Sequence, residues 1–215
     1  MEPRRQHYAR LFAFATALLS EPSFAADEEN NELPRQSKSN IVILLADDLG
    51  WGDVGYHDPQ VATPNIDAIA THGVELDRFY VNPTCSPTRA SLLTGQFSTT
   101  HGVNGPIQWH SKEGLPLEWQ TLPGYLKRAG YQTHLVGKWH LGNASTAYWP
   151  QQRGFDSFYG HLNGGVGYFD HVFSGGLDWQ KDGATLREKG YTTQLIQDAA
   201  IDLIENRSAE DEPLF

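Results

Sequence analysis

The sequence contains one cysteine, one methionine and fewer basic than acidic residues, with 16 Lys and Arg against 26 Asp and Glu. A single cysteine excludes an internal disulfide framework, so apolar packing must hold the core together. The net charge of -10 argues against the broad basic surface that nucleic-acid-binding proteins carry. A site for an anionic substrate would therefore have to gather its few cationic groups locally.

Long apolar segments are also scarce, and no run is long enough to span a bilayer. The short apolar run Leu11–Leu19 follows a basic start and precedes small residues around Ala25 and Ala26. This pattern predicts that residues 1–26 are a secretory signal peptide and that the protein is exported, to a periplasm, a lysosome or the medium. Residues 27–39 are polar and charged, which predicts a flexible lead-in.

Residues 40–215 alternate between candidate strands and helices. This predicts an α/β fold with a mainly parallel or mixed sheet and helices on both faces. The aliphatic run Asn40–Ala46 is typical of a strand buried on both faces. Further strands are predicted at 74–81, at 131–136 and from Pro213 onward. Apolar spacing and glycine stops predict helices at 63–71, 121–130 and 192–206. The glycine- and aromatic-rich residues 153–176 predict a loop.

Two adjacent carboxylates, Asp47 and Asp48, follow the first candidate strand directly. Ligand sites in open α/β sheets lie at the carboxyl ends of strands. Adjacent carboxylates repel each other unless a cation lies between them, and their hard oxygens suit Ca²⁺, with Mg²⁺ as the weaker alternative. Taken alone, such a pair is more typical of a solvated acidic turn, so the metal hypothesis depends on the residues that follow.

The stretch Cys85–Gly95 reads Cys-Ser-Pro-Thr-Arg-Ala-Ser-Leu-Leu-Thr-Gly and predicts a short helix. Ser86 is a favourable N-cap, the next residue is a proline at the first helical position, and Gly95 suits a left-handed stop. Cys85 then lies just ahead of the helix N-terminus, where free N–H groups favour an anion. Arg89 lies in the first turn, where a cation is unfavourable, which indicates a negative partner nearby.

A second polar segment, Gly-Lys-Trp-His-Leu-Gly at 137–142, follows the strand predicted at 131–136. Separately, Lys138 is typical of a solvated lysine, His140 of a structural histidine and Cys85 of a small buried hydrophobe. On one side of the predicted sheet, however, they would lie together with the two aspartates. His161 and His171 are further candidates for substrate contact, although ordinary loop histidines fit them better.

The pattern Cys-x-Pro-x-Arg followed by Thr-Gly is the signature of the type I sulfatases, and the sequence resembles that family over nearly all of 40–215. The 137–142 segment resembles the Gly-Lys-Trp-His-Leu-Gly segment of sulfatases. Arg-Gly-Phe-Asp at 153–156 and the order of elements after it resemble the arylsulfatase B-like branch most. The resemblance implies a sulfuric ester hydrolase of the alkaline phosphatase superfamily. It also implies that a formylglycine-generating or sulfatase-maturing enzyme oxidises Cys85 to formylglycine (3-oxoalanine).

The family resemblance also implies roles for individual residues. Asp47, Asp48 and the converted Cys85 match the Ca²⁺ ligands, and the hydrated aldehyde attacks the sulfur of the ester. The remaining assignments are Arg89 to fix and polarise the formylglycine, Lys138 to neutralise the ester oxygens, and His140 to orient the diol or exchange its proton.

Sulfatases are considerably longer than 215 residues and take an Asp-Asn metal pair, a second histidine and a second lysine from downstream segments. The sequence therefore resembles the N-terminal part of a sulfatase, and these residues alone are expected to bind metal weakly and turn over poorly. Two alternatives remain open: a phosphate or phosphonate ester hydrolase of the same superfamily, and a truncated non-catalytic product. The resemblance makes sulfated N-acetylgalactosamine in glycosaminoglycans the candidate substrate.

Overall fold

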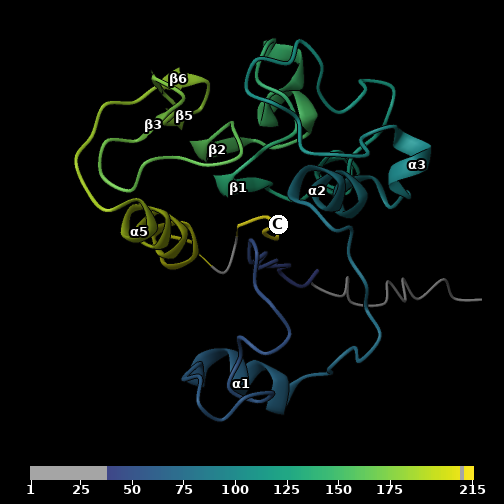
Figure 1. The fold of residues 1–215 in the computed structure, drawn as a ribbon, viewed down its shortest axis with the longest axis vertical. Coiled ribbons are helices and arrows are strands. Elements are labelled where there is room, and N and C mark those ends of the chain that lie inside the picture. Colours follow the sequence, from purple (N-terminus) through teal and green to yellow (C-terminus); the bar gives the residue numbers. More distant parts are fainter. Residues whose placement is uncertain (1–37, 209–210) are drawn as a thin grey trace, which may run out of the picture. The chain divides into compact units, whose positions relative to one another are not determined.

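The computed structural model describes residues 38–208 and 211–215, and residues 38–215 form one compact unit (Figure 1). The predicted signal peptide and nearly all of the predicted lead-in lie outside the described residues. No helix in the described part of the chain is long and apolar enough to cross a membrane.

A mixed four-stranded sheet in the order β1-β2-β5-β6 organises the fold. The strands β1 and β2 are parallel, whereas β2, β5 and β6 pair antiparallel. Their bounds are His134–Lys138 for β1, Ser157–His161 for β2, Gln180–Lys181 for β5 and Ala184–Thr185 for β6. A separate hairpin joins β3, Val172–Phe173, to β4, Gly176–Leu177. The predicted α/β class with a mixed sheet is confirmed.

The two central strands approach each other closely at a pair of glycines. Gly137 of β1 and Gly160 of β2 are register partners, and both have positive φ angles, 107° and 147°. A Cβ atom on Gly160 would lie 2.0 Å from the carbonyl oxygen of Gly137. Only glycine fits there, so these residues fix the spacing of the strands that lead into the site.

The described residues also contain α-helices and two short 3₁₀ helices. The α-helices are α1 (Pro64–His72), α2 (Cys85–Thr94), α3 (Ser98–His101), α4 (Leu122–Arg128) and α5 (Thr192–Glu205). Two 3₁₀ helices, η1 (Thr146–Tyr148) and η2 (Pro150–Arg153), precede β2. Helix α5 packs against β1 and β2, and α2 packs against α3 and α4 (Figure 1). The helices predicted at 63–71, 121–130 and 192–206 are confirmed to within a few residues.

The hydrophobic core lies around β1, β2 and α2. Trp139 and Phe158 are each 1% exposed, and the Trp139 ring meets that of Phe155 edge-on, with centroids 6.2 Å apart. The buried members of this core cluster all lie between residues 90 and 162: Ala90, Val103, Leu115, Trp139, Leu141, Phe155, Phe158 and Leu162. The core therefore covers one side of the α2 N-terminus and the segment that follows β1.

The buried strand predicted at Asn40–Ala46 is wrong. These residues form no strand, and the side chains of Val42 and Leu44 are 57% and 81% exposed. Within the described residues, this run makes a single backbone hydrogen bond, from the Ile41 N–H to the Leu214 carbonyl at 2.7 Å. An apolar run becomes a strand only where a neighbouring strand satisfies its backbone groups along its length.

The remaining strand and loop predictions have mixed outcomes. Residues 74–81 form no strand and are exposed, and β1 begins three residues later than predicted. The predicted loop at 153–176 is wrong for β2, for β3 and for the first residue of β4. In β2, Gly160 obscures the alternation of half-buried and buried residues. Leu214 instead forms an isolated parallel bridge with Gln132, so the extended conformation predicted from Pro213 onward is present.

Candidate active site

Helix α2 places Cys85 as its first residue, with Thr84 as the N-cap. Ser86 is therefore not the N-cap that the sequence predicts. Gly95 does end the helix in the left-handed conformation, with φ of 67°. Cys85 is a free, half-buried thiol. Because it is the first residue of α2, its Sγ atom lies at a helix end with unpaired backbone N–H groups.

The side chain of Ser86 links α2 to two loops instead of capping the helix. Its hydroxyl donates to the His140 carbonyl at 2.8 Å and accepts from the Ile107 N–H at 3.0 Å. Ser86 is fully buried. A loop hydrogen bond of this kind depends on the tertiary arrangement, so capping preferences alone could not reveal it.

His140 lies directly beside Cys85, with its Nδ1 atom 3.1 Å from Sγ. Its other ring nitrogen, Nε2, lies 2.9 Å from the carbonyl oxygen of Ile107, which can only accept a hydrogen bond. The Nε2 atom therefore carries the proton. Burial, reinforced by the positive charge of Lys138, lowers the pKa of His140 to about 4, so the ring is neutral near pH 7. The Nδ1 lone pair thus faces Cys85 as an acceptor.

The backbone around His140 is held by an extension of the β1–β2 pairing. The Trp139 N–H donates to the His161 carbonyl at 2.9 Å, and the His140 N–H donates to the Leu162 carbonyl at 3.0 Å. His140 has a positive φ of 58°, and a Cβ on Gly164 would lie 2.7 Å from its ring. The loop after β2 therefore closes directly on the imidazole.

A buried carboxylate stabilises the loop that follows β2. Asp178 is 6% exposed and accepts from the N–H of Leu162 at 3.0 Å and from the N–H of Asn163 at 2.8 Å. Sequence reasoning missed Asp178, since nothing in its neighbours marks an acidic residue as buried. His161 and His171 are 6% and 1% exposed, and His161 is the last residue of β2 rather than an ordinary loop histidine.

An ion-pair cluster forms the second half of the candidate site. One oxygen of Asp47, Oδ2, lies 2.8 Å from both Arg89 Nη2 and Lys138 Nζ. Arg89 also donates to the Lys138 carbonyl at 2.5 Å. Burial alone would raise the pKa of Asp47, but the hydrogen bonds and charges of Lys138 and Arg89 outweigh it and lower that pKa. Asp47 is thus the negative partner that the position of Arg89 predicts.

The structure leaves the metal assignment untested. In the part of the chain that the structure describes, no three His, Cys, Asp or Glu side chains are arranged to hold a metal ion. The two carboxylates of Asp47 and Asp48 have the hard oxygens that Ca²⁺ prefers, whereas the thiol of Cys85 does not. Asp48 has a positive φ of 62°, so its backbone turns sharply at this point. The two aspartates fit a hard cation by chemistry but form an incomplete shell.

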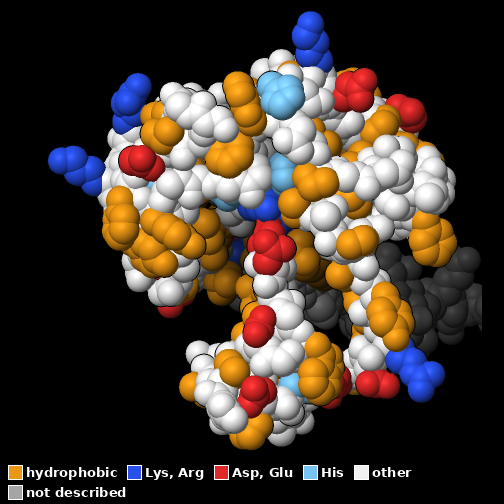
Figure 2. Space-filling model, viewed as in Figure 1, with side chains coloured by type: hydrophobic (Ala, Val, Ile, Leu, Met, Phe, Trp, Pro, Cys, Tyr) orange, Lys and Arg blue, Asp and Glu red, His pale blue; other side chains and the backbone are white. Residues whose placement is uncertain are grey.

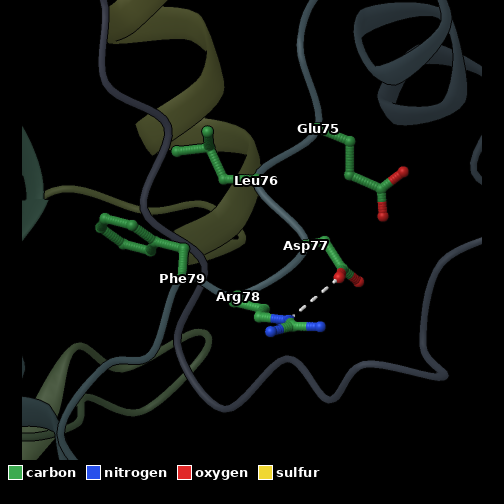
Figure 3. A pocket seen from close by; sticks show the side chains of 5 residues that line it. All are labelled: Glu75, Leu76, Asp77, Arg78 and Phe79. Atoms are coloured by element: carbon green, nitrogen blue, oxygen red, sulfur yellow. Dashed lines mark ion pairs between the residues drawn. The ribbon is translucent and has the colours of Figure 1, made fainter.

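Charged side chains of both signs gather on the face of the molecule shown in Figure 2. Figure 2 shows acidic, basic and histidine side chains adjacent to one another near the centre of the face in view. A hollow of about 460 Å³ lies elsewhere, in the exposed segment Glu75–Phe79. There, Leu76 and Phe79 point to one side of the chain and the acidic residues to the other (Figure 3). This hollow shares no residue with the Cys85 cluster.

Comparison with known proteins places this arrangement in context. The family model described as Sulfatase matches residues 39–215. The chain is 38% identical over 198 residues to N-acetylgalactosamine-6-sulfatase of Rattus norvegicus, covering 82% of this chain and 38% of that protein. It is 43% identical over 136 residues to Arylsulfatase J of Mus musculus, covering 63% and 23% respectively.

Solved structures give the same picture. Ps i-CgsB, determined in complex with k-i-k-neocarrahexaose, matches with a TM-score of 0.77 and 29% identity, covering 83% of this chain and 44% of that one. BT4656, determined with its substrate D-glucosamine-2-N,6-O-disulfate, matches with a TM-score of 0.64 and 32% identity, covering 83% and 33%. The chain thus spans less than half the length of each of these four proteins.

Proposed function

This chain belongs to the sulfatase family, and we propose that the whole protein is a sulfuric ester hydrolase acting on sulfated glycans. The observation that carries the proposal is the contact between Cys85 Sγ and the neutral His140 Nδ1, beside Arg89 and Lys138. The glycan part rests on the relatives, which include an N-acetylgalactosamine-6-sulfatase and a protein crystallised with a disulfated glucosamine. Sulfated N-acetylgalactosamine is accordingly a candidate substrate.

The reaction requires Cys85 to be converted to formylglycine by a formylglycine-generating or sulfatase-maturing enzyme. A half-buried thiol at the first residue of a helix, with an acceptor nitrogen 3.1 Å away, supports this conversion. The hydrated form of the new side chain supplies an oxygen nucleophile for the sulfur of the ester. In the proposed reaction, the His140 Nδ1 lone pair accepts a hydrogen bond from that hydroxyl and takes its proton; its 3.1 Å contact with Cys85 Sγ supports this role.

In the proposed reaction, the cations of the site receive the sulfate group. The side chains of Arg89 and Lys138 are 11% and 12% exposed, so their charges act in a poorly solvated environment. Both converge on one carboxylate oxygen of Asp47, which fixes their positions. Ca²⁺, with Mg²⁺ as the weaker alternative, would be held by Asp47, Asp48 and an oxygen of the converted Cys85. When bound, it supplies positive charge next to the sulfate oxygens.

Export of the protein is part of the proposal. The first 26 residues resemble a secretory signal peptide, and the described residues contain no helix that could span a membrane. A sulfatase that acts on glycans outside the cytoplasm or in a lysosome would need such a signal. Exposure of the mature N-terminus after export, read by N-terminal sequencing, tests this part directly.

The experiment that tests the function uses the whole protein, produced together with a maturing enzyme and assayed on an aryl sulfate and the matching aryl phosphate. We expect sulfate hydrolysis to exceed phosphate hydrolysis and to fall to the uncatalysed rate in Cys85→Ala. Mass spectrometry of the peptide that contains Cys85 should show an aldehyde in place of the thiol. Chelation should abolish the activity, and added Ca²⁺ should restore it.

The controls separate the alternatives. His72→Gln, on the exposed helix α1 and away from the cluster, should leave both rates unchanged. Faster hydrolysis of the phosphate would identify the phosphate or phosphonate ester hydrolase. An unconverted Cys85 together with no dependence on Ca²⁺ would favour the non-catalytic alternative.

A further inference from the structure

Three aromatic side chains lie exposed on the loop after β2 and at the start of α5. Tyr168, Phe169 and Tyr191 are 63%, 73% and 44% exposed. The ring centroid of Tyr191 lies 5.5 Å from that of Tyr168 and 5.4 Å from that of Phe169, with interplanar angles of 39° and 35°. We propose that this trio, the aromatic platform, binds a sugar ring of the substrate glycan next to the sulfated residue. The proposal rests on the function proposed above.

The platform is built on a firmly held backbone. The Thr192 N–H donates to the Tyr168 carbonyl at 2.8 Å, and the Thr192 hydroxyl donates to the Gly167 carbonyl at 3.1 Å. Thr192 itself is 5% exposed. The N–H of Gly167 donates to the Val172 carbonyl at 2.9 Å, which closes the loop on itself. The rings are therefore presented to solvent by a rigid frame, which lowers the entropic cost of binding.

The loop that carries the platform starts at the candidate active site. Gly164 packs against the ring of His140, where a Cβ would lie 2.7 Å from the imidazole. Tyr168 follows four residues later, so the chain between them spans at most about 14 Å. The platform is therefore carried by the same loop that contacts His140, the residue whose ring lies 3.1 Å from Cys85.

The chemistry of the platform fits an uncharged sugar better than a second sulfate. Aromatic rings offer apolar faces for the C–H groups of a pyranose, and the two tyrosines add hydroxyl groups for its polar edge. The exposed carboxylate of Asp170 lies in the same loop, with its Oδ1 atom accepting from the Val172 N–H at 3.1 Å. That negative charge would repel a sulfate group. The proposed ligand is therefore an unsulfated ring adjoining the sulfated one.

The surface view is consistent with this placement. Figure 2 shows hydrophobic side chains gathered where Figure 1 places α5 and the loop that leads into it. Isolated exposed hydrophobic residues are common on proteins, but a cluster of three large rings, in which Tyr191 contacts both of the others, is a sign of a binding surface.

The test compares two substrates of the whole, converted protein. In the double variant Y168A/F169A we expect kcat/KM on a sulfated oligosaccharide to fall about tenfold or more, mainly through KM. Hydrolysis of a small aryl sulfate, which cannot reach the platform, should be unchanged. The matched control is Phe97→Ala, which removes a ring that is 82% exposed outside this loop and should leave both substrates unaffected.

A second variant separates sugar stacking from general hydrophobic contact. Y168L/F169L keeps apolar side chains but removes the aromatic faces, and it should lose the oligosaccharide preference as Y168A/F169A does. Unchanged oligosaccharide hydrolysis in both variants would overturn the proposal, as would an equal loss on the two substrates. A change in oligomeric state in Y168A/F169A that Y168L/F169L does not show would instead identify a protein interface.

A binding measurement tests the aromatic platform even if the proposed sulfatase activity fails. If the unaltered protein hydrolyses no sulfate ester, binding of the unsulfated oligosaccharide can still be measured by quenching of the intrinsic fluorescence. Saturable quenching that Y168A/F169A lacks supports the platform, and the absence of binding by the unaltered protein refutes it.

Discussion

Two regions of the described chain differ sharply in packing. Residues 84–215, the packed region, contain the sheet and the whole core cluster. In residues 38–83, the exposed region, Val54 is the single buried residue, and α1 has no buried residue at all. Yet the apolar run of the exposed region is as hydrophobic as any in the packed region. The comparison shows that an apolar segment is buried only where another part of the chain packs against it, whatever its own composition.

The candidate active site takes groups from both regions. The packed region holds Cys85 and His140 through a dense set of backbone and side-chain hydrogen bonds. The exposed region contributes Asp47, which is attached to the rest of the site through ion pairs with Arg89 and Lys138. The nucleophile and its acceptor are thus preorganised, whereas the carboxylate depends on electrostatic attraction.

The largest predicted effect compares one core residue with one exposed residue. Phe158→Ala should lower the free energy of unfolding by about 3–5 kcal/mol, because a fully buried ring is removed from the core. Leu44→Ala, at a side chain that is 81% exposed, should change it by less than about 0.5 kcal/mol. Urea unfolding of the two variants measures both. A large effect of Leu44→Ala would show that this run is covered in solution.

A second prediction uses two histidines, one from each region, whose pKa values shift in opposite directions. Burial, opposed by the charge of Asp178, lowers the pKa of His161 to about 4. As the pH falls below about 6.5, the imidazole of His161 takes up a proton in the unfolded chain before it does so in the folded chain. Stability should therefore decrease between about pH 6.5 and pH 4. Each pKa unit corresponds to about 1.4 kcal/mol at most. His161→Gln should flatten this part of the stability profile.

His57 in the exposed region should behave in the opposite way. Burial alone would lower the pKa of His57, but Glu75 at 2.8 Å from Nε2 and the Trp51 carbonyl at 2.7 Å from Nδ1 raise it. Both partners accept hydrogen bonds, so they favour the doubly protonated ring. Its stabilisation is present below the unfolded pKa and is lost as the pH rises through the folded value. A wild-type profile identical to that of His57→Gln would contradict this.

The smallest predicted effect concerns the link between the regions. A double-mutant cycle of Asp47→Asn and Lys138→Met should give a coupling energy of about 1 kcal/mol or less, reduced by added salt. The matched control is the pair Asp77–Arg78, separated by 3.7 Å and almost fully exposed, which should show no coupling. Equal coupling in both pairs would mean that the partial burial of Lys138 does not strengthen its ion pair.

The sequence predicts those parts of the fold whose signals are local. Helices α1, α4 and α5 carry proline or glycine boundaries or a clear apolar face, and all three are confirmed. Strand β2 escapes detection because Gly160 and two polar residues interrupt its alternation. The strand predicted at Asn40–Ala46 fails for the opposite reason, since its composition is ideal but its partners cannot be inferred from composition.

In the candidate site, too, the sequence predicts the residues with local signals and misses those that depend on distant contacts. Motif and spacing single out Cys85, Arg89, Lys138 and His140, and the structure brings them into one cluster with Asp47. The supporting hydrogen bonds of Ser86 and Asp178 are invisible in the sequence, because their partners are backbone groups of distant loops. The metal assignment to Asp47 and Asp48 stays a prediction.

The contact between Leu214 and the start of the apolar run has a consequence for synthesis. The Leu214 N–H donates to the Asn40 side chain, 174 residues away in the chain. During translation this contact can form only after residue 214 has emerged from the ribosome, long after the run itself. The contact fixes one end of the run only, because Val42 and Leu44 are still 57% and 81% exposed after it has formed. The run is an uncharged, β-prone stretch of aliphatic residues, which is a sequence type prone to aggregation both before and after the contact forms.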